Sequence, residues 1–458
     1  MAETQPTPRG PATSNPTASV TAARRSRERA VLVHVRFPGH AADSEIEELR
    51  QLVQSAGADA CHLVLGARER PDAASFVGKG KAEEIRDVVA RERADLVVVN
   101  HELSPAQERN LERAVACRIV DRTRLILDIF AQRARSHEGK LQVELAQLEH
   151  MASRLVRGWT HLERQKGGIG LRGPGETQLE VDRRLIRDRI KKLNQRLRQV
   201  ALQRRSRRRA RHKVPIPTVS MVGYTNAGKS SLFNRLTDAG VYAADQLFAT
   251  LDPTMRRLEL PGKVPVILAD TVGFISALPH SLVAAFKSTL EEVAQADLLL
   301  HVIDSHDPEQ RDHVEQVDRV LAEIDAATVP RILVYNKIDL TQRAPRVERD
   351  ANGRVAKVWI SATTGEGVNF LIDALSNHFR EQRRALTLEL PPSAGRLRAK
   401  IYDRLDVIRE TRLDAGGWLI ELALDPAQLA WLKQQEGFST DYLTAHPAII
   451  LAPTGSLS

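Results

Sequence analysis

Val219-Ser-Met-Val-Gly-Tyr-Thr-Asn-Ala-Gly-Lys-Ser-Ser231 joins a β-branched apolar run to a Gly-x-x-x-x-Gly-Lys-Ser pattern, and a helical periodicity follows. Gly223 and Gly228 let the backbone wrap closely around phosphate oxygens, so that N–H groups and the positive end of the next helix face the anion. Lys229 would reach the β- and γ-phosphates, and the Ser230 hydroxyl would bind magnesium. An ordinary glycine turn is the alternative for this pattern alone. The predicted phosphate-binding residues are Gly223, Tyr224, Thr225, Asn226, Ala227, Gly228, Lys229, Ser230 and Ser231.

Two further motifs follow strand-like runs downstream. Residues 264–269 lead into Asp270-Thr-Val-Gly273, where a P-loop enzyme needs a carboxylate for magnesium and a backbone N–H for the γ-phosphate. Residues 331–335 lead into Asn336-Lys-Ile-Asp339. The Asp339 carboxylate can accept hydrogen bonds from N1–H and the exocyclic amine of guanine, and adenine lacks this donor pair, so GTP is favoured over ATP. The predicted nucleotide-binding residues here are Asp270, Thr271, Val272, Gly273, Asn336, Lys337 and Asp339.

A fourth motif, Val358-Trp-Ile-Ser361 followed by Ala362-Thr-Thr-Gly365, is a strand-to-loop junction whose N–H groups would close over the guanine oxygen. It adds Ser361, Ala362 and Thr363 to the predicted nucleotide site. Four such motifs in this order predict a P-loop G domain with a mostly parallel sheet over residues 214–388.

This set of motifs resembles the translation-factor-related class of small-G-protein domains. The resemblance implies that Thr250 in Phe248-Ala-Thr-Leu-Asp252 is the switch threonine, with Thr254 as the alternative. Phe274 stands where the Ras pattern has a glutamine that orients the attacking water, so hydrolysis should be slow unless it is activated. The implied magnesium ligands are Ser230 and Thr250, and the implied catalytic residues are Lys229, Thr250, Gly273 and Asn226.

Asn226 lies at the P-loop position where potassium-activated G proteins of this class carry an asparagine. There the side-chain carbonyl would help to hold K⁺, whose charge would act much as an arginine finger does. The alternative is that Asn226 only hydrogen-bonds the backbone of its own loop, a frequent role of asparagine. The sequence leaves both open, so the expected cofactors are Mg²⁺ and, in the first case, K⁺.

Composition sets outer limits on the architecture. At 458 residues, 42% apolar and 27% charged, the chain should form three or four globular domains. No uncharged apolar run approaches the roughly 18 residues of a membrane span. Cys61 and Cys117 are the only two cysteines, which favours a reducing cytoplasm. Residues 1–28 are rich in Pro, Thr, Ser, Ala and Arg and predict a disordered tail.

Positive charge is concentrated in one segment. Residues 151–213 hold 20 Lys and Arg against 5 Asp and Glu, whereas the whole chain carries a net charge of +9. The remainder of the chain is therefore net negative. A local excess of this kind favours a nucleic-acid contact over general basicity.

Residues 29–136 alternate apolar runs with helical patterns, which predicts βαβ units on a parallel sheet. Within them, Val77-Gly-Lys-Gly-Lys81 precedes a helix and admits two interpretations. A simple glycine turn is favoured because the pattern lacks Walker spacing, and a second nucleotide site, for ATP, is the alternative.

Residues 137–213 predict an antiparallel helical hairpin with a glycine-rich tip. Apolar residues from Leu141 to Leu162, and again from Ile186 to Val200, recur at alternating spacings of four and three. The first helix is expected over residues 139–166, and Gly167-Gly-Ile-Gly-Leu-Arg-Gly-Pro-Gly175 separates it from the second. Basic residues on the second helix outnumber their potential i,i+4 partners, so phosphate is the expected counter-charge. A solvated coiled-coil spacer is the alternative.

Gly170-Leu-Arg-Gly-Pro-Gly-Glu-Thr-Gln-Leu-Glu-Val-Asp-Arg-Arg184, directly upstream of a G domain, resembles the HflX family of ribosome-associated GTPases. The resemblance extends from about residue 30 over nearly the full chain. It implies binding to the large ribosomal subunit and its rRNA, with splitting or rescue of stalled or inactive ribosomes, and ATP-dependent RNA remodelling linked to the N-terminal domain. The expected RNA-binding residues are Arg172, Arg183, Arg184, Arg187, Lys191 and Lys192.

Residues 389–458 predict a small α+β domain after Pro391-Pro392. Strands are expected at residues 398–402 and 418–424, and a helix at residues 426–432. The sequence thus predicts a multidomain α/β protein: a cytoplasmic GTPase, monomeric, with GTP, GDP and the large subunit as partners. Two alternatives stay open: an ATP-driven RNA-remodelling enzyme regulated by its G domain, and a G protein that regulates a protein partner through a dimerising coiled coil.

Overall fold

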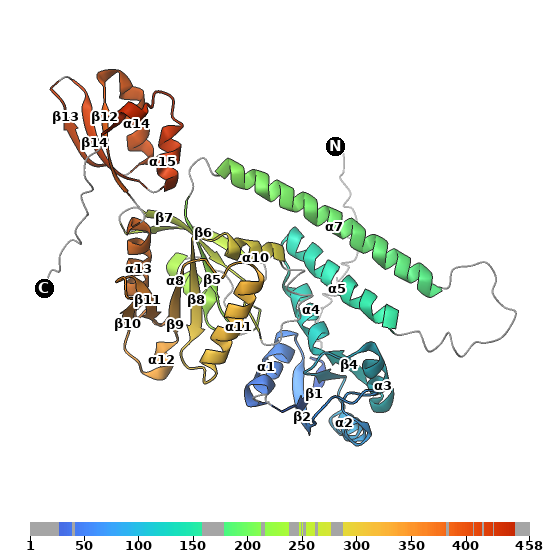
Figure 1. The fold of residues 1–458 in the computed structure, drawn as a ribbon. Coiled ribbons are helices and arrows are strands. Elements are labelled where there is room, and N and C mark those ends of the chain that lie inside the picture. The colour runs from blue at the N-terminus through green and yellow to red at the C-terminus, as the bar shows by residue number, and fades with distance from the viewer. Residues whose placement is uncertain are drawn as a thin grey trace, which may run out of the picture.

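The computed structural model describes residues 27–38, 42–157, 178–211, 216–237, 247–248, 250, 253–261, 264–275, 287–381, 384–405, 407–414, 416–424 and 426–444. Three sheets form three α/β units along the chain, and a pair of long helices lies beside the first unit (Figure 1). The predicted multidomain α/β fold class is confirmed.

The N-terminal unit is a four-stranded parallel sheet in the order β2-β1-β3-β4. β1 is buried on both faces because Ala30 and Leu32 pack into one core while Val31, Val33 and Val35 pack into another. The elements are β1 (Arg29–Arg36), α1 (Ala42–Ser55), β2 (Asp59–Ala67), α2 (Lys79–Glu92), β3 (Leu96–Val99), α3 (Pro105–Val115), β4 (Arg118–Asp121) and α4 (Arg122–Arg133).

The helical arm consists of α5 (His137–Arg157) and α7 (Gln178–Arg211), which lie side by side (Figure 1). Their predicted apolar seams meet where Leu141 and Leu145 pack against Leu193. Arg189 Nε donates to Glu144 Oε1 at 2.7 Å, which together with the Leu pairs fits an antiparallel register. The predicted end of the first helix and the glycine-rich tip lie outside the described residues.

Arg154 of α5 fixes the arm to the N-terminal unit. Its guanidinium pairs with Glu108 of α3 and with Asp121 at the end of β4. Asp121 is fully buried, and burial raises the pKa of its carboxyl to about 6. An unpaired charge at this depth would be costly, so the arginine and the carboxylates stabilise each other.

The central unit is a seven-stranded sheet in the order β10-β11-β9-β8-β5-β7-β6, with antiparallel pairing only at the two edges. β5 lies in its interior and leads directly into the Gly223–Lys229 turn and α8. The elements are β5 (Thr218–Val222), α8 (Lys229–Thr237), β6 (Thr254–Leu260), β7 (Val264–Asp270), α10 (Lys287–Ala294), β8 (Leu298–Asp304), α11 (Gln310–Glu323), β9 (Arg331–Asn336), α12 (Ile338–Thr341), β10 (Arg346–Arg349), β11 (Val355–Trp359) and α13 (Val368–Glu381).

The C-terminal unit is an antiparallel sheet in the order β13-β14-β12-β15. The strand expected at residues 398–402 is wrong: this segment lies in α14, where Leu397 and Ile401, four residues apart, face the core. β12 pairs with β14, so this sheet already begins at Arg384. The elements are β12 (Arg384–Leu390), η1 (Pro392–Ala394), α14 (Gly395–Arg404), β13 (Val407–Arg412), β14 (Trp418–Leu424), α15 (Pro426–Lys433), η2 (Thr440–Tyr442) and β15 (Leu443–Thr444).

One apolar core is shared between the N-terminal and central units. Leu52 of α1 and Phe130 of α4 belong to the same buried cluster as Phe248 and Phe274. The first unit therefore packs against the nucleotide-facing segments of the second. Among the described helices, none has the length and apolar character needed to cross a lipid bilayer.

Candidate active site

The turn after β5 requires glycine at both ends. Gly223 has φ +144°, and a Cβ there would lie 2.2 Å from the carbonyl oxygen of Val302. Gly228 has φ +93°, and a Cβ there would lie 2.1 Å from Asn336 Nδ2. At Gly223 a side chain would collide with backbone, and at both positions φ lies in a region that side chains disfavour, which is the physical reason for the glycine spacing. This open turn followed by a helix N-terminus has the geometry of a phosphate cradle.

Lys229 is buried at the start of α8, and its ammonium is held by the loop itself. Nζ donates to the carbonyl oxygens of Gly223 at 3.1 Å and Tyr224 at 2.6 Å. Burial lowers the pKa of this lysine to about 8, while Asp270 acts in the opposite direction. A bound phosphate would supply the negative charge that two neutral carbonyls provide only in part.

Three oxygen-bearing side chains meet beside Lys229, as a magnesium site requires. Ser230 Oγ donates to Asp270 Oδ2 at 2.7 Å, Thr250 Oγ1 donates to the same oxygen at 2.9 Å, and the two hydroxyls lie 2.9 Å apart. Asp270 is fully buried, burial raises its pKa, and its Oδ1 has no hydrogen-bond partner among the described residues. Hydroxyls and a carboxylate with an unused oxygen fit Mg²⁺, which prefers such ligands. Thr254, the alternative, begins β6.

On the base side, Asn336 joins the two loops that would enclose the guanine. Its Nδ2 donates to the Ala227 carbonyl at 2.9 Å, and its Oδ1 accepts from the Ala362 N–H at 2.8 Å. Lys337 Nζ lies 2.7 Å from Asp304. Asp339 is exposed in the first turn of α12, where its carboxylate is accessible to a base.

Two functional candidates were not identified by motif spacing: Arg235, and Asp304, which pairs with Lys337. Arg235, on α8, donates to the carbonyl oxygens of Ala362 and Thr363 and so supports the guanine loop from the phosphate-binding helix. Arginine at this position follows no short motif, and only the folded chain brings it there. The remaining predicted residues stand on or directly after the same elements: Ser231 on α8, Thr271 and Val272 after β7, and buried Ser361 after β11.

The segment after β7 lies against the P-loop. A Cβ at Gly273 would come within 2.9 Å of Lys229 Nζ, so the backbone at Gly273 passes close to the lysine that is predicted to reach the γ-phosphate. Phe274 is buried, and its N–H and C=O bond to Gly223 O at 3.1 Å and Thr225 N at 2.7 Å. This side chain is packed away from solvent and cannot orient water.

Asn226 has φ +60°, a left-handed conformation that asparagine tolerates better than most residues. Its side chain makes no hydrogen bond to any described residue. The alternative of bonding to its own loop is therefore not realised within the described part of the chain.

Comparison with known proteins places this arrangement in a family. The chain is 54% identical to GTPase HflX of Escherichia coli (strain K12) over 91% of its own length and 98% of that relative's, and 46% identical to GTPase HflX of Magnetococcus marinus over 91% and 97%. The chain belongs to the HflX family. Family models described as GTP-binding GTPase N-terminal, GTP-binding GTPase Middle Region and 50S ribosome-binding GTPase match residues 43–131, 133–211 and 218–337.

As in the HflX family, the protein binds GTP and is a GTPase, which confirms the predicted activity. Among solved structures, the chain is similar to a GTP-binding protein from Sulfolobus solfataricus in complex with GDP. The identity is 23% and the TM-score 0.42, over 76% of this chain and 98% of that one.

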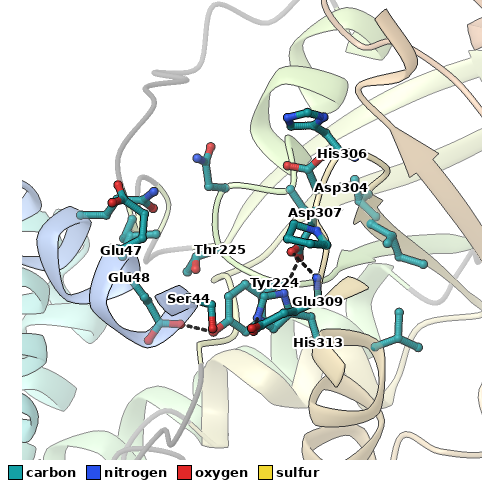
Figure 2. Close-up of a pocket in the computed structure, with 18 of the residues that line it drawn as sticks. Ser44, Glu47, Glu48, Tyr224, Thr225, Asp304, His306, Asp307, Glu309 and His313 are labelled. Carbon is teal, nitrogen blue, oxygen red and sulfur yellow. Dashed lines mark hydrogen bonds and ion pairs between the residues drawn. The ribbon is translucent and has the colours of Figure 1, made fainter. Parts of the chain in front are cut away.

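A cavity of about 560 Å³ lies between α1 and the P-loop (Figure 2). Across it, Tyr224 Oη donates to Glu48, and Glu48 also pairs with buried Arg122. The Tyr224 ring stacks on His313, with centroids 3.8 Å apart, and His313 contacts Asp307. Tyr224 lies far in sequence from both Glu48 and His313, so no local motif predicts these two contacts.

The described RNA-binding candidates lie on α7. Arg184, Arg187, Lys191 and Lys192 are exposed, and Arg183 is half-buried. Arg183 and Arg184 both have interactions within the protein. Arg184, Arg187 and Lys191 are spaced three and four residues apart and therefore share one face of the helix. Arg172 lies outside the described residues.

Proposed function

We propose that this GTPase binds the large ribosomal subunit through its basic arm and uses the GTP-bound state to split or rescue stalled or inactive ribosomes. The observation that carries the proposal is the exposed stripe of Arg184, Arg187 and Lys191 on a helix directly upstream of the G motifs. The match to a family model described as 50S ribosome-binding GTPase supports a ribosomal partner. The charge of the stripe fits the rRNA phosphate backbone.

In the proposed mechanism, the loop from Gly223 to Lys229 holds the phosphates, and the Gly273 N–H donates to the γ-phosphate. Asp339 reads the base, with Ala362 and the loop around Ser361 closing over it. Ser230, Thr250 and Asp270 would hold Mg²⁺, which neutralises charge on the β- and γ-phosphates when bound. Because Phe274 is buried, water must be oriented by another group, and the ribosome or a K⁺ ion near Asn226 would supply the missing activation.

Steady-state hydrolysis of GTP and ATP, each with and without purified ribosomes, tests this function. We expect GTP turnover near the roughly 10⁻⁴ to 10⁻² per second of unassisted G domains, with acceleration by ribosomes and little ATP turnover. Fast GTP turnover in sodium buffer without ribosomes would contradict the proposal. ATP turnover that depends on Lys79 and Lys81 would instead support the RNA-remodelling alternative at the N-terminal unit.

Two structural facts bear on that alternative. Gly78, at φ +82°, caps α2, and Lys81 Nζ is already engaged by the Leu65 carbonyl and Glu84. Both fit a turn without requiring a phosphate. We further propose that the protein is a monomer that acts in the cytoplasm. Sedimentation at micromolar concentration would check the monomeric state, and cell fractionation would check the localisation.

A further inference from the structure

Two residues of the N-terminal unit hold the segment that precedes Thr250. Phe248 packs edge-on against Phe130 of α4, with ring centroids 4.6 Å apart and 76° between the ring planes. The Leu247 N–H donates to Ser55 Oγ, at the end of α1, at 3.0 Å. All four residues are buried, so the contacts are protected from water.

Phe248 also has an unusual backbone conformation, with a positive φ angle. Its φ is +56°, in the left-handed region where a bulky side chain crowds its own backbone. Such a conformation persists only when surrounding structure holds it. Among the described residues, Phe130 and Ser55 supply that support from a unit more than 100 residues away in sequence.

Holding Phe248 also restricts Thr250. Residues two positions apart are separated by no more than about 7 Å of extended chain, so the anchor fixes the region that Thr250 can reach. In the structure Thr250 lies within 2.9 Å of both Ser230 Oγ and Asp270 Oδ2. The anchored segment thus delivers the threonine hydroxyl to the other two proposed magnesium ligands.

We propose that Phe130 and Ser55 are positioning residues for GTP hydrolysis, which act by holding Leu247 and Phe248 so that Thr250 stays at the Ser230–Asp270 pair. The inference rests on the Thr250 role in the proposed function. The N-terminal unit would then stabilise the GTP-bound state. The γ-phosphate, Mg²⁺ and the contacts of α1 and α4 with Leu247 and Phe248 all favour the same placement of Thr250. GDP, which lacks the γ-phosphate, should be much less sensitive to this contact.

The test compares the full-length chain with Phe130→Leu, Ser55→Ala, Thr250→Ala and the Phe130→Leu/Thr250→Ala double variant. Affinities for GDP and a non-hydrolysable GTP analogue are measured by fluorescence, and hydrolysis is followed against Mg²⁺ concentration. We expect Phe130→Leu and Ser55→Ala each to weaken the GTP analogue by roughly two- to tenfold, as removal of one aromatic pair or hydrogen bond predicts, and to raise the Mg²⁺ requirement, with GDP unchanged. The double variant should bind the GTP analogue no more weakly than Thr250→Ala does.

Phe76→Leu is the matched control, because Phe76 is a buried phenylalanine in the core on the opposite face of the N-terminal sheet. It should lower thermal stability as Phe130→Leu does while leaving the ratio of GTP-analogue to GDP affinity unchanged. Equal weakening of both nucleotides in Phe130→Leu, or additive weakening in the double variant, would overturn the inference. A normal ratio of GTP-analogue to GDP affinity in Thr250→Ala would show that Thr250 is not the magnesium ligand, and this would also overturn the inference. Ribosome binding by the arm does not depend on that result.

Discussion

Asp339 carries the proposed choice of base through an exposed carboxylate at the start of α12. We predict that Asp339→Asn weakens GTP by about 10- to 100-fold, since the substitution removes a charged acceptor pair, and favours xanthosine triphosphate, whose 2-oxo group accepts from the new amide. Competition binding with both nucleotides measures this. An undiminished preference for GTP would reject the assignment.

A variant at Asn226 tests whether K⁺ activates GTP hydrolysis. Because its φ of +60° strains most side chains, Asn226→Gly is a cleaner variant than alanine. We expect the wild type to hydrolyse GTP faster in potassium chloride than in sodium chloride at equal ionic strength, by at least about tenfold, and the glycine variant to lose the difference. Equal wild-type rates in both salts would leave Asn226 with a conformational role only.

His301 of β8 is buried, and its Nδ1 has no hydrogen-bond partner among the described residues. Burial lowers the pKa of the ring to about 4. The pKa of His301 is lower in the folded state than in the unfolded state, so the neutral ring favours folding. This contribution to the free energy of unfolding is fully present above about pH 6.5 and is lost as the pH falls towards 4. The decrease should reach about 3 kcal/mol of unfolding free energy.

Urea unfolding at several pH values measures that slope. His301→Leu should flatten it between pH 6.5 and 4, whereas His306→Leu, at an exposed histidine of the following loop, should not. The same slope in both variants would show that other groups govern acid stability.

At the scale of elements, the positive charge of α7 should make ribosome binding depend on salt concentration. Replacing Arg184, Arg187 and Lys191 with glutamine should reduce the dependence of log K on log salt by about one unit for each phosphate that the arm no longer neutralises. Sedimentation of the complex at several ionic strengths provides the slope. Arg311, Arg319 and Arg343 of the central unit, also exposed, form a control triple with the same change in charge. Binding that does not respond to salt would favour the coiled-coil alternative.

The P-loop turn, the parallel sheets and the arm seam were predictable because each rests on local spacing: two glycines, alternating apolar runs, and leucines three and four residues apart. The strand expected at Arg398–Tyr402 is wrong because a segment of five residues that includes β-branched and aromatic side chains fits both the strand period of two and the helix period of 3.6. The helix is distinguished by Leu397 and Ile401, which face the same core.

Contacts between units were not predictable in this way. Phe130 and Phe248 are separated by more than 100 residues, as are Glu48 and Tyr224, and each looks like an ordinary core or surface residue in its own segment. Their partners are set by how α1 and α4 dock on the central sheet, a tertiary property that no short pattern encodes. The candidate site could therefore be predicted on its nucleotide side but not on the side that faces the N-terminal unit.

At the scale of the whole molecule, three features link the nucleotide to the arm. Phe248 packs on Phe130 of α4, α5 begins four residues after α4 ends, and Arg154 pairs α5 to the N-terminal unit. A change at Thr250 can thus reach the arm through packed helices rather than through a flexible linker. This arrangement suits a protein in which nucleotide state controls engagement with a large RNA surface.

We propose that the GTP-bound state drives the basic arm into the large subunit and separates the ribosome. Light scattering of intact ribosomes, mixed with the protein and a non-hydrolysable GTP analogue, measures this directly. We predict that wild type lowers the scattering as subunits separate, and that GDP does not support this. The Arg184, Arg187 and Lys191 glutamine variant, with normal nucleotide affinity, should leave ribosomes intact. Splitting by that variant at the wild-type rate would show that the arm does not drive subunit separation.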